Sequence, residues 1–366
     1  MDAAPVSGAR PVAVRTRRRA SLRAALHWAV LAAAVGYLAY QLPPLVRSAR
    51  AQSDRLGDVG WGWAALGALL GIAAVAVYAE LHRVLLAIGG ARLPAGTVQS
   101  ITFAENAIGN TIPVVGGAGG LAYAITRFHR RGAEPAVASW AVLLAGLLTT
   151  LTLVELAAAG LAVTGRLPRA PCIVVLVGTA AVAVGLWTAA THPPVLRSVL
   201  RPLLRAGRWI PGQCPVCREG RAADPEGLTE RVSARLALLR PSRGQWVQLL
   251  AISLLTWVLD FGDLLASSAA ALGTVPVSAL VWGFVIVQGS IALQILPGGA
   301  GLAEVGLLGA LLAAGAPAGP AAITVLLYRA GSWLLPTLLG WAAYGAHIHL
   351  TRARPHRHPA PAVAGS

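Results

Sequence analysis

The stretch LQILPGGAGLAEVGLLGALLAAG, residues 293–315, decides the fold of this chain. It is apolar almost throughout, yet it contains Pro297, Gly298 and Gly299 and then a single carboxyl, Glu304. Proline and glycine interrupt a helix, and the backbone groups that they free find no partner in lipid. The sequence therefore predicts a broken helical element that is buried in protein or reached by water.

The composition of the whole chain is that of a membrane protein. Of its 366 residues, 56% are hydrophobic and only 12% are charged, about half the charged fraction of a soluble domain. Several apolar runs approach the ~20 residues that cross a hydrocarbon core as a helix. We therefore expect an all-α polytopic membrane protein, and its longest polar stretch, residues 192–245, is near the lower limit for an independent fold.

The basic residues follow the topology of a membrane protein rather than a nucleic-acid surface. The formal net charge is +16, and all 30 basic residues are arginine. They lie in tails and loops between apolar spans, whereas nucleic-acid domains gather them on one folded face. We therefore expect no nucleic-acid partner, a multi-pass location in the cell (plasma) membrane, and cytoplasmic N- and C-termini.

The same pattern divides the chain into a basic cytoplasmic tail (1–23), a transmembrane domain (24–346) with a polar cytoplasmic loop (192–245), and a second cytoplasmic tail (347–366). In the second span, Gly67 and Gly71 form a small-residue packing face. For the first span, cleavage as a signal peptide after Ala49-Arg50-Ala51 is an alternative, but the apolar run is long and two prolines intervene. The predicted spans are about 24–42, 61–86, 136–163, 171–191, 246–272 and 319–345.

Two segments, 97–126 and 277–316, do not fit simple spans, and they resemble each other. Residues 110–146 and 293–331 both contain a proline followed by Gly-Gly-Ala-Gly, then a Gly-Ala near a proline, then Ala-rich sequence leading to Val-Leu-Leu. Chance similarity between two Ala- and Gly-rich stretches is the alternative. We expect two re-entrant helical hairpins, and the arginine bias makes the first enter from inside and the second from outside, as an inverted repeat. The hairpin turns are predicted at Pro113, Gly116, Gly117, Pro297, Gly298, Gly299 and Gly301.

Inverted repeats with broken segments at matching positions indicate the mid-membrane site of a transporter. The N–H groups at the start of a half-helix can hold an anionic group there. A proline-glycine kink in a packed helix is the alternative for either segment alone.

Polar residues within the apolar segments are the candidate translocation residues. Asp260 and Asp263, three residues apart, share a helix face, and Glu304 can pair with Arg329, functionally or as a structural ion pair. The excess of carboxyls over cations indicates that some are protonated, which suits proton coupling. The candidate set is Glu105, Asn106, Asn110, Asp260, Asp263, Glu304 and Arg329.

The motifs NTIPVVGGAGG and ILPGGAGLAEVGL…LLYRAGSWLLPTLLG resemble the lysylphosphatidylglycerol synthase transmembrane, or flippase-like, family over about residues 60–345. The positions of Pro297, Gly298, Gly299, Gly301, Glu304 and Arg329 match the family's pattern. The resemblance implies movement of an amphipathic phospholipid or a polyprenyl-linked lipid between leaflets, and it makes a homo-oligomer or a cell-envelope biosynthesis partner possible. Where members usually carry a charge after the first Gly-Gly turn, this chain has Leu-Ala-Tyr-Ala (121–124). Aminoacyl transfer is not expected, because only about twenty residues follow the last span.

The polar loop contains the remaining chemical motif, Cys214 and Cys217. This pair resembles half of a zinc knuckle, but tetrahedral zinc needs four ligands. A reduced thiol pair is therefore the default, with a metal site shared between two chains as the alternative, and we expect no metal or cofactor. The basic segment 227–240 favours contact with anionic inner-leaflet lipids or, equally, packing on the bundle.

Three functions are consistent with these patterns. A lipid translocase, with or without proton coupling, is favoured; a small-solute or ion secondary transporter is the alternative. A membrane-embedded lipid-sugar transferase ranks last, because the polar loop shows no Asp-x-Asp arrangement, and we therefore expect no enzyme activity. A lateral opening wide enough for lipid, rather than a closed aqueous vestibule, would distinguish the first function from the second.

Overall fold

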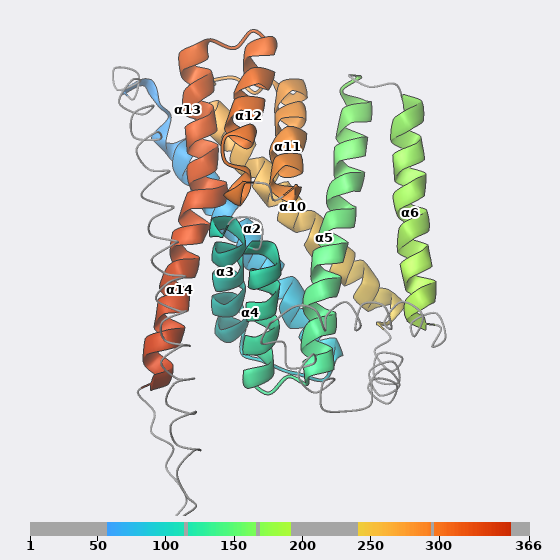
Figure 1. The fold of residues 1–366 in the computed structure, drawn as a ribbon. Helices are drawn as coiled ribbons and strands as arrows, with labels where there is room; N and C mark the ends of the chain where they lie inside the picture. The colour runs from blue at the N-terminus through green and yellow to red at the C-terminus, as the bar shows by residue number, and fades with distance from the viewer. Residues whose placement is uncertain (1–56, 113–115, 166–168, 192–240, 294–295, 353–366) are drawn as a thin grey trace, which may run out of the picture. The chain divides into compact units, whose positions relative to one another are not determined.

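The computed structural model describes residues 57–112, 116–165, 169–191, 241–293 and 296–352, which are helical with short connections and include no strand (Figure 1). These residues belong to one compact unit, residues 52–366. The predicted span at 24–42, the basic tail 1–23 and nearly all of the polar loop lie outside the described residues, as do Pro113, Cys214 and Cys217.

Four helical stretches within the described ranges are long and apolar enough to cross a membrane: α2 (Trp61–Ile88), α5 (Pro135–Val163), α10 (Arg243–Leu272) and the continuous stretch Ala318–His347. The last stretch consists of α13 (Ala318–Arg329), a π-helical segment η3 (Ala330–Leu334) and most of α14 (Leu335–Arg352). The shorter described apolar part of α6 (Arg169–Thr191) coincides with the span predicted at 171–191. The predicted positions of these helices are thus confirmed.

Local sequence explains where α10 begins and ends. The Ser242 hydroxyl accepts a hydrogen bond from the Gln245 backbone N–H, and the Gln245 side chain accepts one from the Ser242 N–H, which satisfies two N–H groups at the helix start. At the other end Gly273 adopts a left-handed conformation (φ 65°), which glycine tolerates without steric cost. The 30-residue helix can therefore run uninterrupted through the unit.

Each of the two unusual segments forms a pair of short helices with a break at the predicted glycines. The first pair is α3 (Ala95–Thr111) and α4 (Gly116–Arg130). The second is α11 (Val277–Ala292) and α12 (Leu302–Ala313), joined through the short 3-10 turn η2 (Pro297–Gly299). Helices α3 and α4 pack on each other, α11 and α12 do the same, and η2 contacts α3, so the two breaks meet. Figure 1 shows one pair below the other, with α2 and α10 crossing behind them.

Close packing of α2 on α10 and η3 depends on small residues. A Cβ atom added at Gly71 would lie 2.5 Å from the Gly331 carbonyl oxygen, and one at Gly67 would lie 2.7 Å from Asp263 Oδ1. Neither contact leaves room for a methyl group, so glycine at these positions allows the helices to approach this closely. The packing face predicted for Gly67 and Gly71 is confirmed.

Candidate functional site

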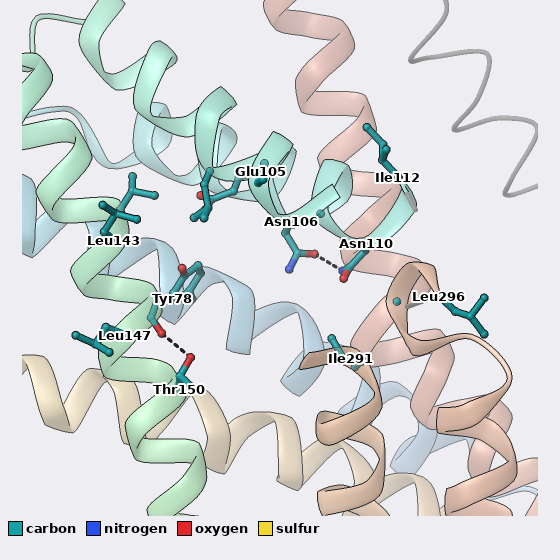
Figure 2. Close-up of a pocket in the computed structure, with 18 residues that line it drawn as sticks. Tyr78, Glu105, Asn106, Asn110, Ile112, Leu143, Leu147, Thr150, Ile291 and Leu296 are labelled. Carbon is teal, nitrogen blue, oxygen red and sulfur yellow. Dashed lines mark hydrogen bonds between the residues drawn. The ribbon is translucent and has the colours of Figure 1, made fainter. Parts of the chain in front are cut away.

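The two breaks line one cavity of about 670 Å³. From the first hairpin it receives the end of α3 and the start of α4, and from the second it receives Ile291, Leu296 and Gly298. Helices α2 and α5 complete the wall with Tyr78 and with residues from Val142 to Thr150. Figure 2 shows that these lining residues come from separate parts of the chain. Both segments therefore contribute residues to the same cavity.

The polar wall of the cavity comes mainly from α3. Glu105, Asn106 and Asn110 all face it, and the Asn110 side-chain amide donates a 3.0 Å hydrogen bond to Asn106 Oδ1 (Figure 2). Tyr78 and Thr150 add hydroxyl groups from α2 and α5. This wall offers hydrogen-bond donors and acceptors in an otherwise apolar setting, which is the usual character of a ligand pocket.

The opposite rim is apolar and open. Leu143 on α5 is 58% exposed and Leu296, before η2, is 43% exposed, and both line the cavity. Thr150 and Ala118, which also line the cavity, are exposed as well. An amphipathic molecule could therefore place a polar group against α3 while its apolar part extends out over these leucines.

Glu105 is the charged side chain among the described lining residues. It is only 7% exposed, and its Oε2 atom has no hydrogen-bond partner. A titratable histidine lies beside it: Nδ1 of His82 on α2 is 3.9 Å from that oxygen. Sequence reasoning missed His82, although Tyr78 and His82 at i and i+4 in an apolar helix put two polar groups on one face.

The Pro-Gly-Gly turn of the second hairpin is held in place by Arg329 of α13. Its Nε donates to Glu304 Oε1 at 2.8 Å, and its Nη2 donates to the Gly298 carbonyl at 2.7 Å. The guanidinium also lies over the Trp333 ring at 5.3 Å, and the residue is 3% exposed. The predicted Glu304–Arg329 pair is formed, and it joins the break to the neighbouring helix.

Gly298 has to be glycine for two independent reasons. Its φ of 58° is left-handed, and a Cβ at this position would collide with the indole nitrogen of Trp333. Gly299 and Gly301 also have positive φ angles, 69° and 84°. The turn predicted from these glycines is thus a tight left-handed path whose Gly298 lines the cavity.

The N-termini of α4 and α12 differ in what occupies them. At α12 the Glu304 carboxylate accepts a 2.6 Å hydrogen bond from the Gly301 N–H, so the helix caps itself with its own anion. The first turn of α4 has no acidic residue, and Gly117 and Ala118 of that turn line the cavity. Of these two helix starts, α4 is therefore the one that lines the cavity without an acidic residue in its first turn.

Asp260 and Asp263 lie away from the cavity lining. Asp260 accepts hydrogen bonds from Gln288 Nε2 (2.6 Å) and the Tyr328 hydroxyl (3.3 Å). Asp263 is fully buried, accepts one 3.2 Å bond from Ser267 Oγ, and packs against the glycines of α2 and η3. These two aspartates link α10 to its neighbours, and the structure does not bring them together with Glu105, Asn106 and Asn110.

The predicted site residues thus separate into three groups: those that line the cavity, those that build or support the hairpin breaks, and the two aspartates Asp260 and Asp263 described above. Glu105, Asn106, Asn110, Gly117 and Gly298 line the cavity. Glu304, Arg329, Gly299 and Gly301 build the turn beside it, and Gly116 packs against the Gly109 carbonyl of α3. Among the described residues no cluster of three or more His, Cys, Asp or Glu side chains could hold a metal ion.

Comparison with known proteins identifies the family. The model of the lysylphosphatidylglycerol synthase TM region matches residues 19–340. This match spans most of the 366 residues, so the chain belongs to that family and is an integral membrane protein. No curated protein matches the chain.

Proposed function

We propose that this member of the family is a flippase-like lipid translocase, which moves an amphipathic phospholipid or polyprenyl-linked lipid between the leaflets of the cell membrane. One observation carries the proposal: both hairpin breaks line the same cavity. The wall of this cavity is polar at α3, and its rim carries exposed leucine side chains. Such a cavity suits a molecule with a polar headgroup and apolar tails, because the tails can remain in lipid while the headgroup leaves it.

The headgroup contacts follow from the polar wall. The N–H groups at the start of α4 suit a phosphate, and the amides of Asn106 and Asn110 suit its hydroxyl or ester oxygens. The apolar surface of Leu143 and Leu296 suits the first part of the tails. The residues in the turn, above all Arg329 and Glu304, position the second break rather than contact the lipid.

The lengths of the short helices support re-entrant hairpins. The helices α3, α4, α11 and α12 have 17, 15, 16 and 12 residues. At about 1.5 Å per residue none reaches the ~30 Å of a hydrocarbon core. We therefore propose six spans with two hairpins entering from opposite sides as an inverted repeat, and cytoplasmic termini in the plasma membrane.

A small-solute or ion transporter is the second candidate, and the central carboxyls Glu105, Asp260 and Asp263 favour it. The exposed apolar rim argues for lipid, because a solute transporter needs an aqueous vestibule closed to the bilayer. We propose no enzyme activity. The proposed partners are membrane lipids, including anionic lipids of the inner leaflet, and either a second copy or a cell-envelope biosynthesis protein.

Liposomes carrying the purified chain test the proposal. The lipid panel contains fluorescent phosphatidylglycerol, a polyprenyl phosphate and a neutral glycolipid, with and without a pH gradient. We expect one lipid to move faster than in empty liposomes, and Asn110→Leu to slow it about tenfold, the effect of losing one hydrogen bond of about 1.4 kcal/mol. The control, Thr179→Val on α6, removes a hydroxyl bonded to its own helix and leaves the rate unchanged. If no lipid moves with folded protein, the translocase proposal is wrong.

A further inference from the structure

A buried histidine beside the cavity has no role in the lipid contacts described above. His82 on α2 is fully buried, and its Nε2 atom has no hydrogen-bond partner. Its Nδ1 lies 3.0 Å from the Thr102 hydroxyl and 3.9 Å from Glu105 Oε2. The pair therefore contains two buried polar atoms without a partner, one on the histidine and one on the carboxyl that lines the cavity.

The described residues packed around this pair are mainly aromatic or small. On α2, Tyr78 stacks edge-on to the His82 ring with centroids 4.7 Å apart, and Phe128 of α4 lies at 5.8 Å. Helix α4 also approaches the Glu105 backbone so closely that a Cβ at Gly120 would lie 2.7 Å from its carbonyl oxygen. On α4, the guanidinium of Arg127 lies over the Tyr123 ring, 5.3 Å from its centroid.

Among the described residues, the titratable groups recorded beside Glu105 are Tyr78 and His82, both on α2. On α14, which packs along α3, Tyr344 and His347 contact Tyr123 and Ser100 instead. Helices α4 and α5 line this part of the cavity with apolar side chains and glycine, including Leu121 and Val142. Glu105 ionised beside a neutral imidazole would be a buried anion without a donor to its Oε2, which is costly. One added proton, on either group, makes the pair neutral overall, and a second would leave a buried cation.

We propose that Glu105 and His82 form a binding site for one exchangeable proton at the wall of the cavity. At 3.9 Å the two groups are too far apart to share that proton in a hydrogen bond, so it resides on one of them and titrates as a property of the pair. The cavity connects Glu105 to the outside, which gives the proton a route in and out.

This site also couples proton binding to lipid binding, a step that rests on the proposed translocase function. A phosphate at the start of α4 and an ionised Glu105 would repel each other in a cavity of low dielectric. Proton uptake by the pair removes that repulsion, and departure of the lipid allows the proton to leave. His82 is a positioning residue in this scheme, because it acts on the lipid only through Glu105.

Infrared spectroscopy of the purified chain during a pH titration tests the proton site without relying on lipid transfer. We expect a protonated-carboxyl C=O band that disappears in Glu105→Gln and persists, at a changed frequency, in Glu105→Asp. In His82→Gln the titration midpoint of that band should move by about one pH unit, the usual effect of an ionisable neighbour at this distance. Two matched controls should leave the band unchanged: Glu80→Gln, whose carboxylate pairs with Arg83 outside the cavity, and His347→Gln on α14.

The outcomes separate this inference from the proposed function. A titration that is identical in the wild type and Glu105→Gln overturns the proton site, and an unmoved midpoint in His82→Gln removes the histidine from it. If the band is present but no lipid moves, the proton site stands and the translocase proposal fails. Where lipid does move, the ratio of its rates at acidic and alkaline pH should fall to one in Glu105→Gln, and a ratio equal to that of the wild type contradicts the coupling.

Discussion

At the scale of single residues, Arg329 illustrates how one side chain can fix a broken backbone. It bonds Glu304 and the Gly298 carbonyl at once, and it is almost fully buried. The fork of the guanidinium makes both contacts possible, because Nε and Nη2 point in different directions. A lysine ammonium is a single point of charge and cannot reproduce this geometry.

We therefore expect Arg329→Lys and Glu304→Gln each to destabilise the second break. Each loses at least one charge-assisted hydrogen bond, which corresponds to about 1.5–3 kcal/mol. Thermal unfolding in detergent should show lower midpoints for both, with reduced lipid transfer and normal membrane insertion. In a double-mutant cycle the two losses should not add, because both remove the same ion pair. Additive losses would show that the residues act separately.

At the scale of elements, the π-helical segment η3 is where α2, α10 and the α13–α14 helix meet. The Gly331 carbonyl lies against Gly71, and the Asp263 carboxyl fits between Gly67, Gly71 and Gly331. The π-helix inserts an extra residue into the turn, a local irregularity that often marks functional positions in helices. Here it brings a backbone carbonyl into the α2–α10 interface.

We expect Gly71→Ala to force these elements apart, because its methyl group would lie 2.5 Å from the Gly331 oxygen and 2.8 Å from Asp263 Oδ2. Overpacking of this kind typically costs about 1–3 kcal/mol. Thermal unfolding should show a lower midpoint for this variant, whereas Gly62→Ala, in the same helix with open space around it, should behave like the wild type. Equal midpoints for the two variants would contradict the packing argument.

At the scale of the whole molecule, the two hairpins meet at their breaks while the loops that connect them to the rest of the chain lie elsewhere. Arg131 follows α4 and Ala314 follows α12, and both are exposed. If the hairpins enter from opposite faces, these positions lie on opposite sides of the membrane.

Cysteine labelling tests that arrangement. In a chain with its three native cysteines replaced, a membrane-impermeant thiol reagent added outside should label Ala314→Cys and leave Arg131→Cys unlabelled until the membrane is permeabilised. Labelling of both positions from the same side would rule out the inverted arrangement, although the cavity would remain.

The sequence by itself determined the helices and the breaks, and it indicated that Glu304 and Arg329 can pair. Apolar runs and Pro-Gly interruptions act within a few residues of chain, so α2, α5, α10 and the two hairpins could be predicted from local pattern. It also indicated Glu105, Asn106 and Asn110 as polar lining, because polar groups before a break at membrane depth need a cavity or a partner.

Only the tertiary structure decided which of the polar residues share a site. It placed His82 beside Glu105, put Tyr78 and Thr150 in the wall of the same cavity, and placed Asp260 and Asp263 in the helix packing outside the cavity lining. Contacts between helices far apart in the chain depend on crossing geometry and on where glycine allows close approach. No local pattern encodes that geometry, which is why the carboxyls of this chain look alike in sequence and differ in the folded protein.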